Sequence, residues 1–170
     1  MSIINPSELD LLEESVIKIN RTAKVTSRGK RFRFSALVAI GDGKGHIGIG
    51  LGKANEVIMC IQKGKEIAKR NMYKVPIING TIPHKIIGKQ GASRVMLKPA
   101  SPGTGIIAGG PVRAVCEVLG IKDIVAKSLG TANPHNVIRA CLKALLKQNS
   151  PKNLSILRNK KISEIIERRG

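Results

Sequence analysis

The sequence predicts an α+β protein built from two small domains. Short stretches in which apolar and polar residues alternate are typical of strands, and they are interspersed with stretches whose apolar residues recur every three or four positions, as in helices. The 170 residues suffice for two small domains, and the hydrophobic share of 42% is enough for folded cores. The pattern changes near Val75-Pro76, where we expect the domain boundary.

The first half predicts a three-stranded sheet and one helix. Alternating stretches at 17–25, 32–40 and 47–52 predict the strands, and Asp42-Gly43 predicts a tight turn between the second and third. A helix is expected over 55–72, with Val57, Ile61, Ala68 and Met72 on its apolar stripe. This domain is expected to span 14–76, after a flexible N-terminal segment at 1–13.

The second half predicts a two-layer β/α domain over 77–150. Strands are expected at 75–78, 84–87, 94–97 and 124–129, with turns at Asn79-Gly80 and Gln90-Gly91. One helix should run from Pro111 to Gly120, and another should begin at Asn133-Pro134, a good cap followed by a proline at the first helical position. Residues 151–170 predict a basic C-terminal arm or short terminal helix.

The charge of the chain points to a polyanionic partner. Lys and Arg number 30 against 11 Asp and Glu, a net charge of +19, and no acidic residue lies between Glu14 and Asp42 or between Glu66 and Glu117. Solubility alone requires neither one sign of charge nor such long acid-free stretches. Nucleic acid or an anionic membrane surface remain as partners. We expect no membrane span, because no apolar run approaches about 20 residues.

The first hairpin connection is the strongest candidate RNA-binding element. Six cations fall within residues 21–33, around Ser27 and Gly29, and a basic β-loop of this kind can enter an RNA groove and pair with phosphates. The alternative is an ordinary solvated loop. The low aromatic share of 2% argues against a surface that stacks many bases. The predicted RNA-binding residues are Arg21, Lys24, Ser27, Arg28, Gly29, Lys30, Arg31, Arg33, Lys53, Lys69 and Arg70.

Glycines occupy one whole face of the strand at 47–52. Gly48, Gly50 and Gly52 leave a bare backbone that a phosphate chain or another polypeptide could approach; equally, a helix or the N-terminal segment could pack tightly there. Residues 43–48 match the GxGxxG pattern of nucleotide-binding proteins, but that pattern should open into a helix, and here its second half lies in a strand.

A second glycine-rich stretch, 103–110, leads into a helix. Helix N-termini favour anions, so this stretch predicts either a phosphate site or a turn that contacts another protein. An enzyme of the small-molecule kinase type is the competing function, but no carboxylate lies between Glu66 and Glu117 to hold a metal or act as a base. The cysteines and histidines lack metal-site spacing. We therefore expect no catalytic residue, no metal and no cofactor, with Cys60, Cys116 and Cys141 as core thiols.

Several ordered motifs resemble the small-subunit ribosomal protein S-five family of bacterial type. The resemblance covers nearly all of residues 14–150 and is carried by 38–43, 48–54, 68–72, 79–81, 99–110 and 130–134, the last reading Gly130-Thr131-Ala132-Asn133-Pro134.

This resemblance implies a double-stranded-RNA-binding-like N-terminal domain, a β/α C-terminal domain and a place in the cytoplasmic ribosome. It implies contacts with small-subunit rRNA and with proteins S-four and S-eight, a position close to the mRNA entry path, and roles in subunit assembly and translational accuracy, with no homo-oligomer and no membrane. Gly103, Thr104, Gly105 and Arg113 match the region that meets protein S-four. The basic loop matches the one beside the spectinomycin site, where this chain has Arg28-Gly29 in place of the family's common glycine pair.

Overall fold

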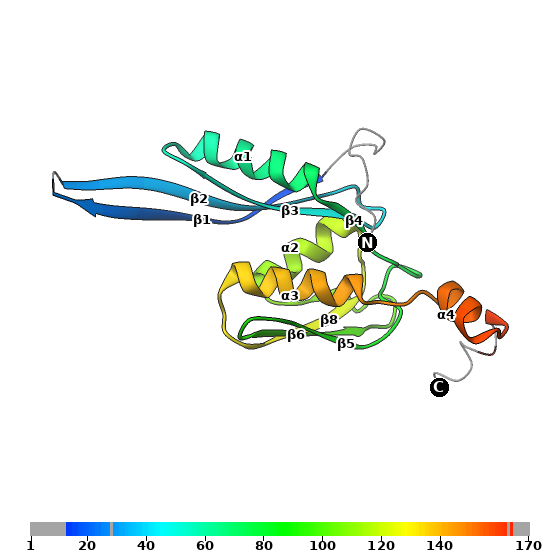
Figure 1. Cartoon of the computed structure of the whole chain (residues 1–170). Helices are drawn as coiled ribbons and strands as arrows, with labels where there is room; N and C mark the ends of the chain where they lie inside the picture. Colours follow the sequence, from blue (N-terminus) through cyan, green and yellow to red (C-terminus); the bar gives the residue numbers. More distant parts are fainter. Residues whose placement is uncertain (1–12, 28, 163, 165–170) are drawn as a thin grey trace.

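The computed structural model describes residues 13–27, 29–162 and 164, and it consists of two four-stranded sheets with helices (Figure 1). The first sheet has the order β1-β2-β3-β4, is antiparallel throughout and carries α1 on one face. Its elements are β1 (Glu13–Thr26), β2 (Gly29–Gly41), β3 (His46–Ala54), α1 (Val57–Arg70) and β4 (Met72–Lys74).

The second sheet has the order β5-β6-β8-β7, with β7 parallel to β8 and the other pairs antiparallel. Helices α2 and α3 pack between this sheet and the first one, and α4 extends away from the body (Figure 1). The elements are β5 (Ile86–Gln90), β6 (Ser93–Pro99), β7 (Ile106–Ile107), α2 (Gly110–Leu119), β8 (Ile124–Gly130), α3 (Pro134–Leu146) and α4 (Pro151–Arg158). The predicted α+β class is confirmed.

The alternation of side chains along β2 distributes apolar residues to two different cores. Ala36, Val38 and Ile40 face α1 and form a small cluster with Cys60 and Ala68. Leu37, one residue out of phase, joins the larger core instead, because successive strand residues point to opposite faces. The first sheet is therefore covered on both faces, by α1 on one side and by the second half of the chain on the other.

The larger core joins the two halves of the chain. Leu37 and Ile47 of the first sheet lie in one buried cluster with residues of α2, α3 and the second sheet. The turn between β2 and β3 also docks on the end of α2, where the Gly43 N–H donates to the Val118 carbonyl at 3.2 Å and the Gly45 N–H to the Leu119 carbonyl at 3.2 Å. The two halves thus share one hydrophobic core, which orients the first sheet against α2.

Three elements differ from the sequence prediction around residues 70–86. The helix ends at Arg70 instead of Met72, which lies in β4 opposite Gly48. The strand predicted at 75–78 is wrong: Val75 bonds Gly45 of the first half, and Ile78 forms only an isolated bridge with Thr81. The strand expected at 84–87 begins later, at Ile86. Short edge strands contain too few residues to show an alternation of apolar and polar side chains. Their positions are therefore set by hydrogen bonds to neighbouring strands.

Other predicted elements are close to their observed positions. Asn79-Gly80 forms a turn with positive φ at both residues (50° and 76°). The Asn133 side chain accepts a hydrogen bond from the His135 N–H and caps α3, and Gly120 ends α2 in the left-handed conformation. The two-residue strand β7 was not predicted, because it lies inside the glycine-rich stretch. Of the expected N-terminal segment, 1–12 lie outside the described residues, and Glu13 begins β1.

Candidate nucleic-acid interface

The β1–β2 hairpin projects beyond the body of the protein as a two-stranded ribbon (Figure 1). Pairing of β2 with β3 ends at Phe34 and Ala54, whereas β1 and β2 continue to pair as far as Thr26 and Gly29. The stretch that the sequence predicted to be a basic loop is therefore mostly strand. The prediction failed because Arg, Lys and Gly interrupt the apolar alternation there, and only pairing across the hairpin keeps the chain extended.

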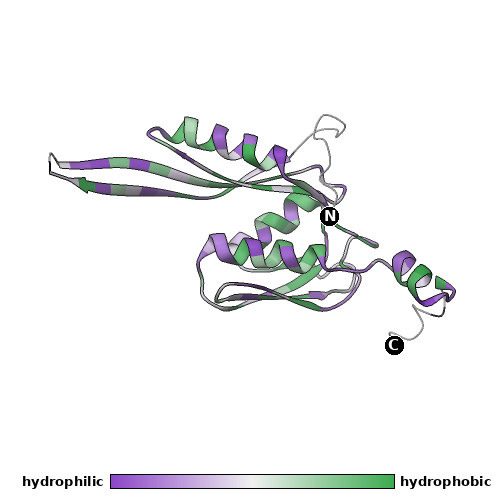
Figure 2. Ribbon diagram, in the orientation of Figure 1, coloured by the Kyte–Doolittle hydropathy of each residue, from purple (hydrophilic) through white to green (hydrophobic). Residues whose placement is uncertain are grey.

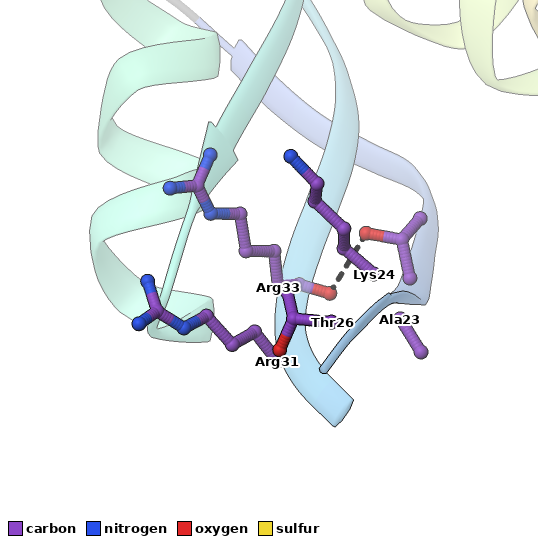
Figure 3. A pocket seen from close by; sticks show the side chains of 6 residues that line it. Ala23, Lys24, Thr26, Arg31 and Arg33 are labelled. Atoms are coloured by element: carbon purple, nitrogen blue, oxygen red, sulfur yellow. Dashed lines mark hydrogen bonds between the residues drawn. The ribbon is translucent and has the colours of Figure 1, made fainter. Parts of the chain in front are cut away.

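One face of the ribbon is basic and hollowed. Lys24 pairs with Arg31 and Thr22 with Arg33 across the strands, so their side chains share one face. With Thr26 they line a hollow of about 350 Å³ (Figure 3). The Thr22 hydroxyl donates to the Arg33 carbonyl at 3.2 Å, which ties the two strands together beside the cations. This face brings three cations into one row.

Hydrophilic and hydrophobic residues alternate along the ribbon (Figure 2), and the strand register places apolar side chains on the face opposite the basic one. The Arg21 guanidinium lies 3.8 Å from the centre of the Phe32 ring, a cation–π contact. Val25 is 71% exposed and Phe32 45% exposed on this side. Lys30, which pairs with Val25, belongs to it as well. Five of the six cations predicted to act as one cluster are described by the structure, and they are thus divided between two faces.

The remaining predicted rRNA-binding residues are distributed unequally. Ser27 and Gly29 lie at the exposed tip, and Arg28 lies outside the described residues. Lys53 is exposed and pairs with Ser35, on the same face of β2 as Arg33, so it continues the basic face towards α3. Lys69 and Arg70 are exposed at the C-terminal end of α1, beside Gly48 and at the far end of β3 from the ribbon. The structure does not bring these two to the hairpin.

His135, in the first turn of α3, adds a titratable group near the basic face. Partial burial lowers its pKa, and the positive charges of Arg139 and Lys53 lower it further. The ring lies with Lys18 and Asn20 around a small hollow of about 50 Å³ below the ribbon. This histidine was not singled out by the sequence, since nothing there places it near Lys53.

The glycine face of β3 is covered by α1, which decides between the two alternatives left open by the sequence. A Cβ atom on Gly48 would lie 2.1 Å from the Ala68 carbonyl oxygen, and one on Gly52 would lie 2.0 Å from that of Cys60. The bare backbone lets the helix approach closely. No RNA can reach this face while α1 is in place.

The glycine-rich stretch before α2 is ordered by a buried carboxylate. The Gly105 N–H donates to Asp123 Oδ1 at 2.8 Å, and the Thr104 hydroxyl donates to the Ser101 carbonyl at 2.7 Å. Asp123 is only 7% exposed. Sequence reasoning missed this residue, because eighteen positions separate it from Gly105 and only the parallel pairing of β7 with β8 brings them together.

Arg113 lies in the first turn of α2, close to Gly103–Gly105 in the chain. Its Nε donates to Glu117 Oε1 at 2.9 Å, and both side chains are about half exposed. Gly103 has φ of +89° and no neighbour within 4 Å of a Cβ position, so this turn is open on its outer side. Of the four residues predicted to contact protein, Gly103, Thr104 and Arg113 are exposed and Gly105 is half-buried.

The cysteines are buried, as predicted. Burial, together with the nearby Glu117, raises the pKa of the Cys116 thiol to about 12, and burial raises that of Cys141 well above its ordinary value. The described residues hold no group of three or more Cys, His, Asp or Glu side chains arranged for a metal ion. Within the same residues, no helix has the length and apolarity needed to cross a membrane.

Comparison with known proteins settles the family. The model for the N-terminal domain of ribosomal protein S5 matches residues 12–76, and the model for the C-terminal domain matches residues 88–158. The chain belongs to the ribosomal protein S5 family. It is thereby a structural constituent of the small ribosomal subunit in the cytoplasmic ribosome, and it is not an enzyme.

Curated relatives named small ribosomal subunit protein uS5 are similar over nearly their whole length. The protein from Pelagibacter ubique is 57% identical over 162 residues, which is 95% of each chain. Those from Chloroflexus aurantiacus and Syntrophobacter fumaroxidans are 51% and 49% identical, covering 98% and 97% of this chain and 93% and 99% of their own. The resemblance seen in the sequence motifs is thus confirmed over both halves of the chain.

Proposed function

We propose that this S5 family member binds small-subunit rRNA through the basic face of its β1–β2 ribbon. The observation that carries the proposal is the row formed by Lys24, Arg31 and Arg33 on one face of a ribbon that extends beyond the body. A two-stranded β-ribbon is narrow enough to enter a nucleic-acid groove. Arginine forks on such a ribbon pair with phosphate oxygens in a bidentate manner.

The electrostatics of the ribbon favour a polyanion over a neutral partner. Within the described part of the chain no carboxylate lines the hollow between Lys24 and Arg33, and Lys53 extends the positive surface towards α3. Each phosphate neutralised by these side chains releases counterions, so binding should weaken steeply as salt rises. Lys69 and Arg70, at the far end of α1, would contact a different stretch of the same RNA.

The test is a salt titration of rRNA binding by a triple variant, Lys24→Ala, Arg31→Ala and Arg33→Ala. We expect weaker binding and a flatter plot of log K against log salt, with the slope reduced by about one unit per lost phosphate contact. The matched control removes the same charge from the second half of the chain, at Lys85, Lys98 and Lys127, and should leave the slope closer to wild type. An unchanged slope in the ribbon variant would exclude the ribbon as the binding element.

We propose a protein contact at the start of α2, where the family resemblance implies protein S-four. The turn at Gly103–Gly105 is exposed yet held by Asp123, so it offers a fixed shape, and Arg113 adds a charged group beside it. Arg113→Glu should weaken binding of purified protein S-four in sedimentation experiments, whereas Lys152→Glu on α4 should not. Equal loss in both variants would indicate a general charge effect instead of a contact at α2.

The contact that the resemblance implies with protein S-eight we assign to α4. Ile156 and Leu157 are 81% and 76% exposed there, and neighbouring apolar side chains of this kind can form part of a protein interaction surface. Together these contacts would place a single copy of the chain close to the mRNA entry path and support subunit assembly and translational accuracy. Replacing Ile156 and Leu157 by Ser should lower the amount of the chain retained on small subunits in a sucrose gradient.

A further inference from the structure

Two adjoining cavities lie between the edge of the first sheet and α3. One has a volume of about 510 Å³ and the other about 600 Å³, and Tyr73 and Leu146 line both of them. Volumes of about 300–1,000 Å³ are typical of ligand sites. The cavities lie towards the opposite end of the first sheet from the ribbon tip, since β4 pairs with the end of β3 that is farther from the ribbon. They therefore form a site separate from the basic ribbon.

The fold places an aromatic ring at the junction of the two cavities. Tyr73 pairs with Ile47 in the first sheet, and its neighbour Met72 pairs with Gly48 on the α1 side. Alternation along β4 turns Met72 into the core and Tyr73 towards α3. Tyr73 is half-buried, so part of the ring remains accessible in the cavities.

The facing stripe of α3 combines apolar and cationic groups. Arg139 and Lys143 lie four residues apart, as do Leu142 and Leu146, so the two pairs run side by side along one face of the helix. All four line the first cavity together with Ile49. Leu142 and Leu146 are half-buried, whereas Arg139 and Lys143 are exposed and form no ion pair with any described residue.

The charge of both cavities has one sign. Arg139 and Lys143 line the first cavity, Lys74 and Lys152 line the second, and among the residues that the structure describes no carboxylate lines either of them. Apolar side chains with one aromatic ring can pack against a flat, weakly polar group, and the four cations around them can pair with phosphates. An unpaired nucleotide within an RNA strand has both parts, because its base stacks on aromatic rings and its backbone carries the negative charge.

We propose that this cleft binds a single-stranded segment of RNA, with one base against Tyr73 and the flanking phosphates near Arg139 and Lys143. The low aromatic content excludes a surface that stacks many bases but not a pocket for one. Phe32 on the ribbon is already stacked with Arg21, which leaves Tyr73 with a cavity beside it. Bound RNA would span the first sheet and α3 and so hold the two halves of the chain together.

The chain supplies its own reporter for this site. Tyr73 is its only tyrosine and it has no tryptophan, so intrinsic fluorescence excited near the tyrosine band comes from the cleft alone. Full-length protein is titrated with a short oligouridine. A parallel titration of N-acetyltyrosinamide measures the loss of emission that is due only to light absorption by the RNA, and this loss is subtracted. We expect saturable quenching of the tyrosine emission. Unchanged emission at RNA concentrations that saturate binding, measured by anisotropy of a labelled oligouridine, would overturn the proposal.

Variants separate the cleft from the ribbon. Arg139→Ala with Lys143→Ala should abolish the quenching, whereas the ribbon triple variant should keep it even where total rRNA binding falls. Tyr73→Ala should lower oligouridine affinity about five- to hundredfold, and Tyr73→Phe, which retains the ring, should stay within about twofold of wild type. Quenching that survives in the Arg139–Lys143 variant would refute the assignment.

Two further probes test the class of ligand. A duplex RNA of equal length should quench less, because its bases are paired and stacked inside the helix. Oligoglutamate of equal charge should neither quench Tyr73 nor displace oligouridine at matched salt. If oligoglutamate did both as well as RNA, the cleft would be a site for acidic protein segments and the RNA proposal would be wrong.

Discussion

Gly50 of β3 and Gly64 of α1 face each other so closely that a Cβ atom on Gly50 would lie 2.0 Å from the Gly64 carbonyl oxygen. Gly48 and Gly52 meet the same helix at similar separations, which makes the glycine face of β3 a packing surface for α1 along its length. The small cluster around Val38 and Cys60 depends on this approach, and so does the position of the strands that continue into the ribbon.

Gly50→Ala should destabilise the protein by about 1–3 kcal/mol or more, because the added methyl forces α1 away from the sheet. Chemical denaturation followed by circular dichroism measures the free energy of unfolding. Gly109→Ala is the control, since nothing lies within 4 Å of a Cβ atom there and φ is negative. A Gly50→Ala protein as stable as the Gly109→Ala protein would show that the helix moves without cost.

Asp42 in the β2–β3 turn should stabilise the fold at neutral pH and lose this effect in acid. Burial alone would raise its pKa, but hydrogen bonds from the backbone N–H groups of His46 and Lys44 and from the His46 ring outweigh burial and lower it. A carboxyl with a lowered pKa stabilises the fold above its unfolded pKa and loses that effect as pH falls through the folded value.

The stability difference between wild type and Asp42→Ala should therefore be larger near pH 6 than near pH 2. The difference between wild type and Glu66→Ala, an exposed position on α1, should change less over the same range. Denaturation curves at several pH values provide the comparison. A gap for Asp42→Ala that stays constant with pH would contradict the role assigned to these hydrogen bonds.

His135, a base where Asp42 is an acid, should also make the protein less stable as the pH falls. Its pKa is lowered by burial and by Arg139 and Lys53, so the unfolded chain takes up a proton at higher pH than the folded one. Stability is then lost as pH falls below about 6.5, the ordinary value for histidine. As the pH is lowered from 8 to 5.5, the free energy of unfolding of His135→Gln should rise relative to that of wild type, because only wild type has a histidine to protonate at this position. A constant difference would count against the lowered pKa.

The buried thiols predict low reactivity in the native state. Cys116 and Cys141 have raised pKa values, and only the thiolate reacts readily with a disulfide reagent. Cys60 is fully buried, and its Sγ lies 3.2 Å from the carbonyl oxygens of both Phe34 and Gly52, which can accept its S–H. At pH 8 the folded protein should react slowly, and all three cysteines should react at once in denaturant. A fast-reacting thiol in the folded protein would show that one of these sites opens readily.

Local sequence determined the elements whose signals do not depend on distant residues. Alternating residues placed β2 and β3, Asn133-Pro134 marked the start of α3, and Gly120 marked the end of α2. The charge of +19 with its acid-free stretches predicted a polyanionic partner, and the ordered motifs identified the family. These features are readable because period, capping and charge act within a few residues.

Tertiary contacts decided what the pattern left open. The glycine face of β3 became a helix-packing surface because α1 folds back onto it, and the predicted basic loop became a ribbon with two faces because β1 and β2 pair to their tips. Likewise, Met72 lies in β4 and not in the helix, Asp123 accepts a hydrogen bond from Gly105, and Tyr73 lines the same cavity as Arg139. Each of these pairings joins residues separated along the chain, and their energies arise from packing and hydrogen bonds that form only when the whole fold assembles.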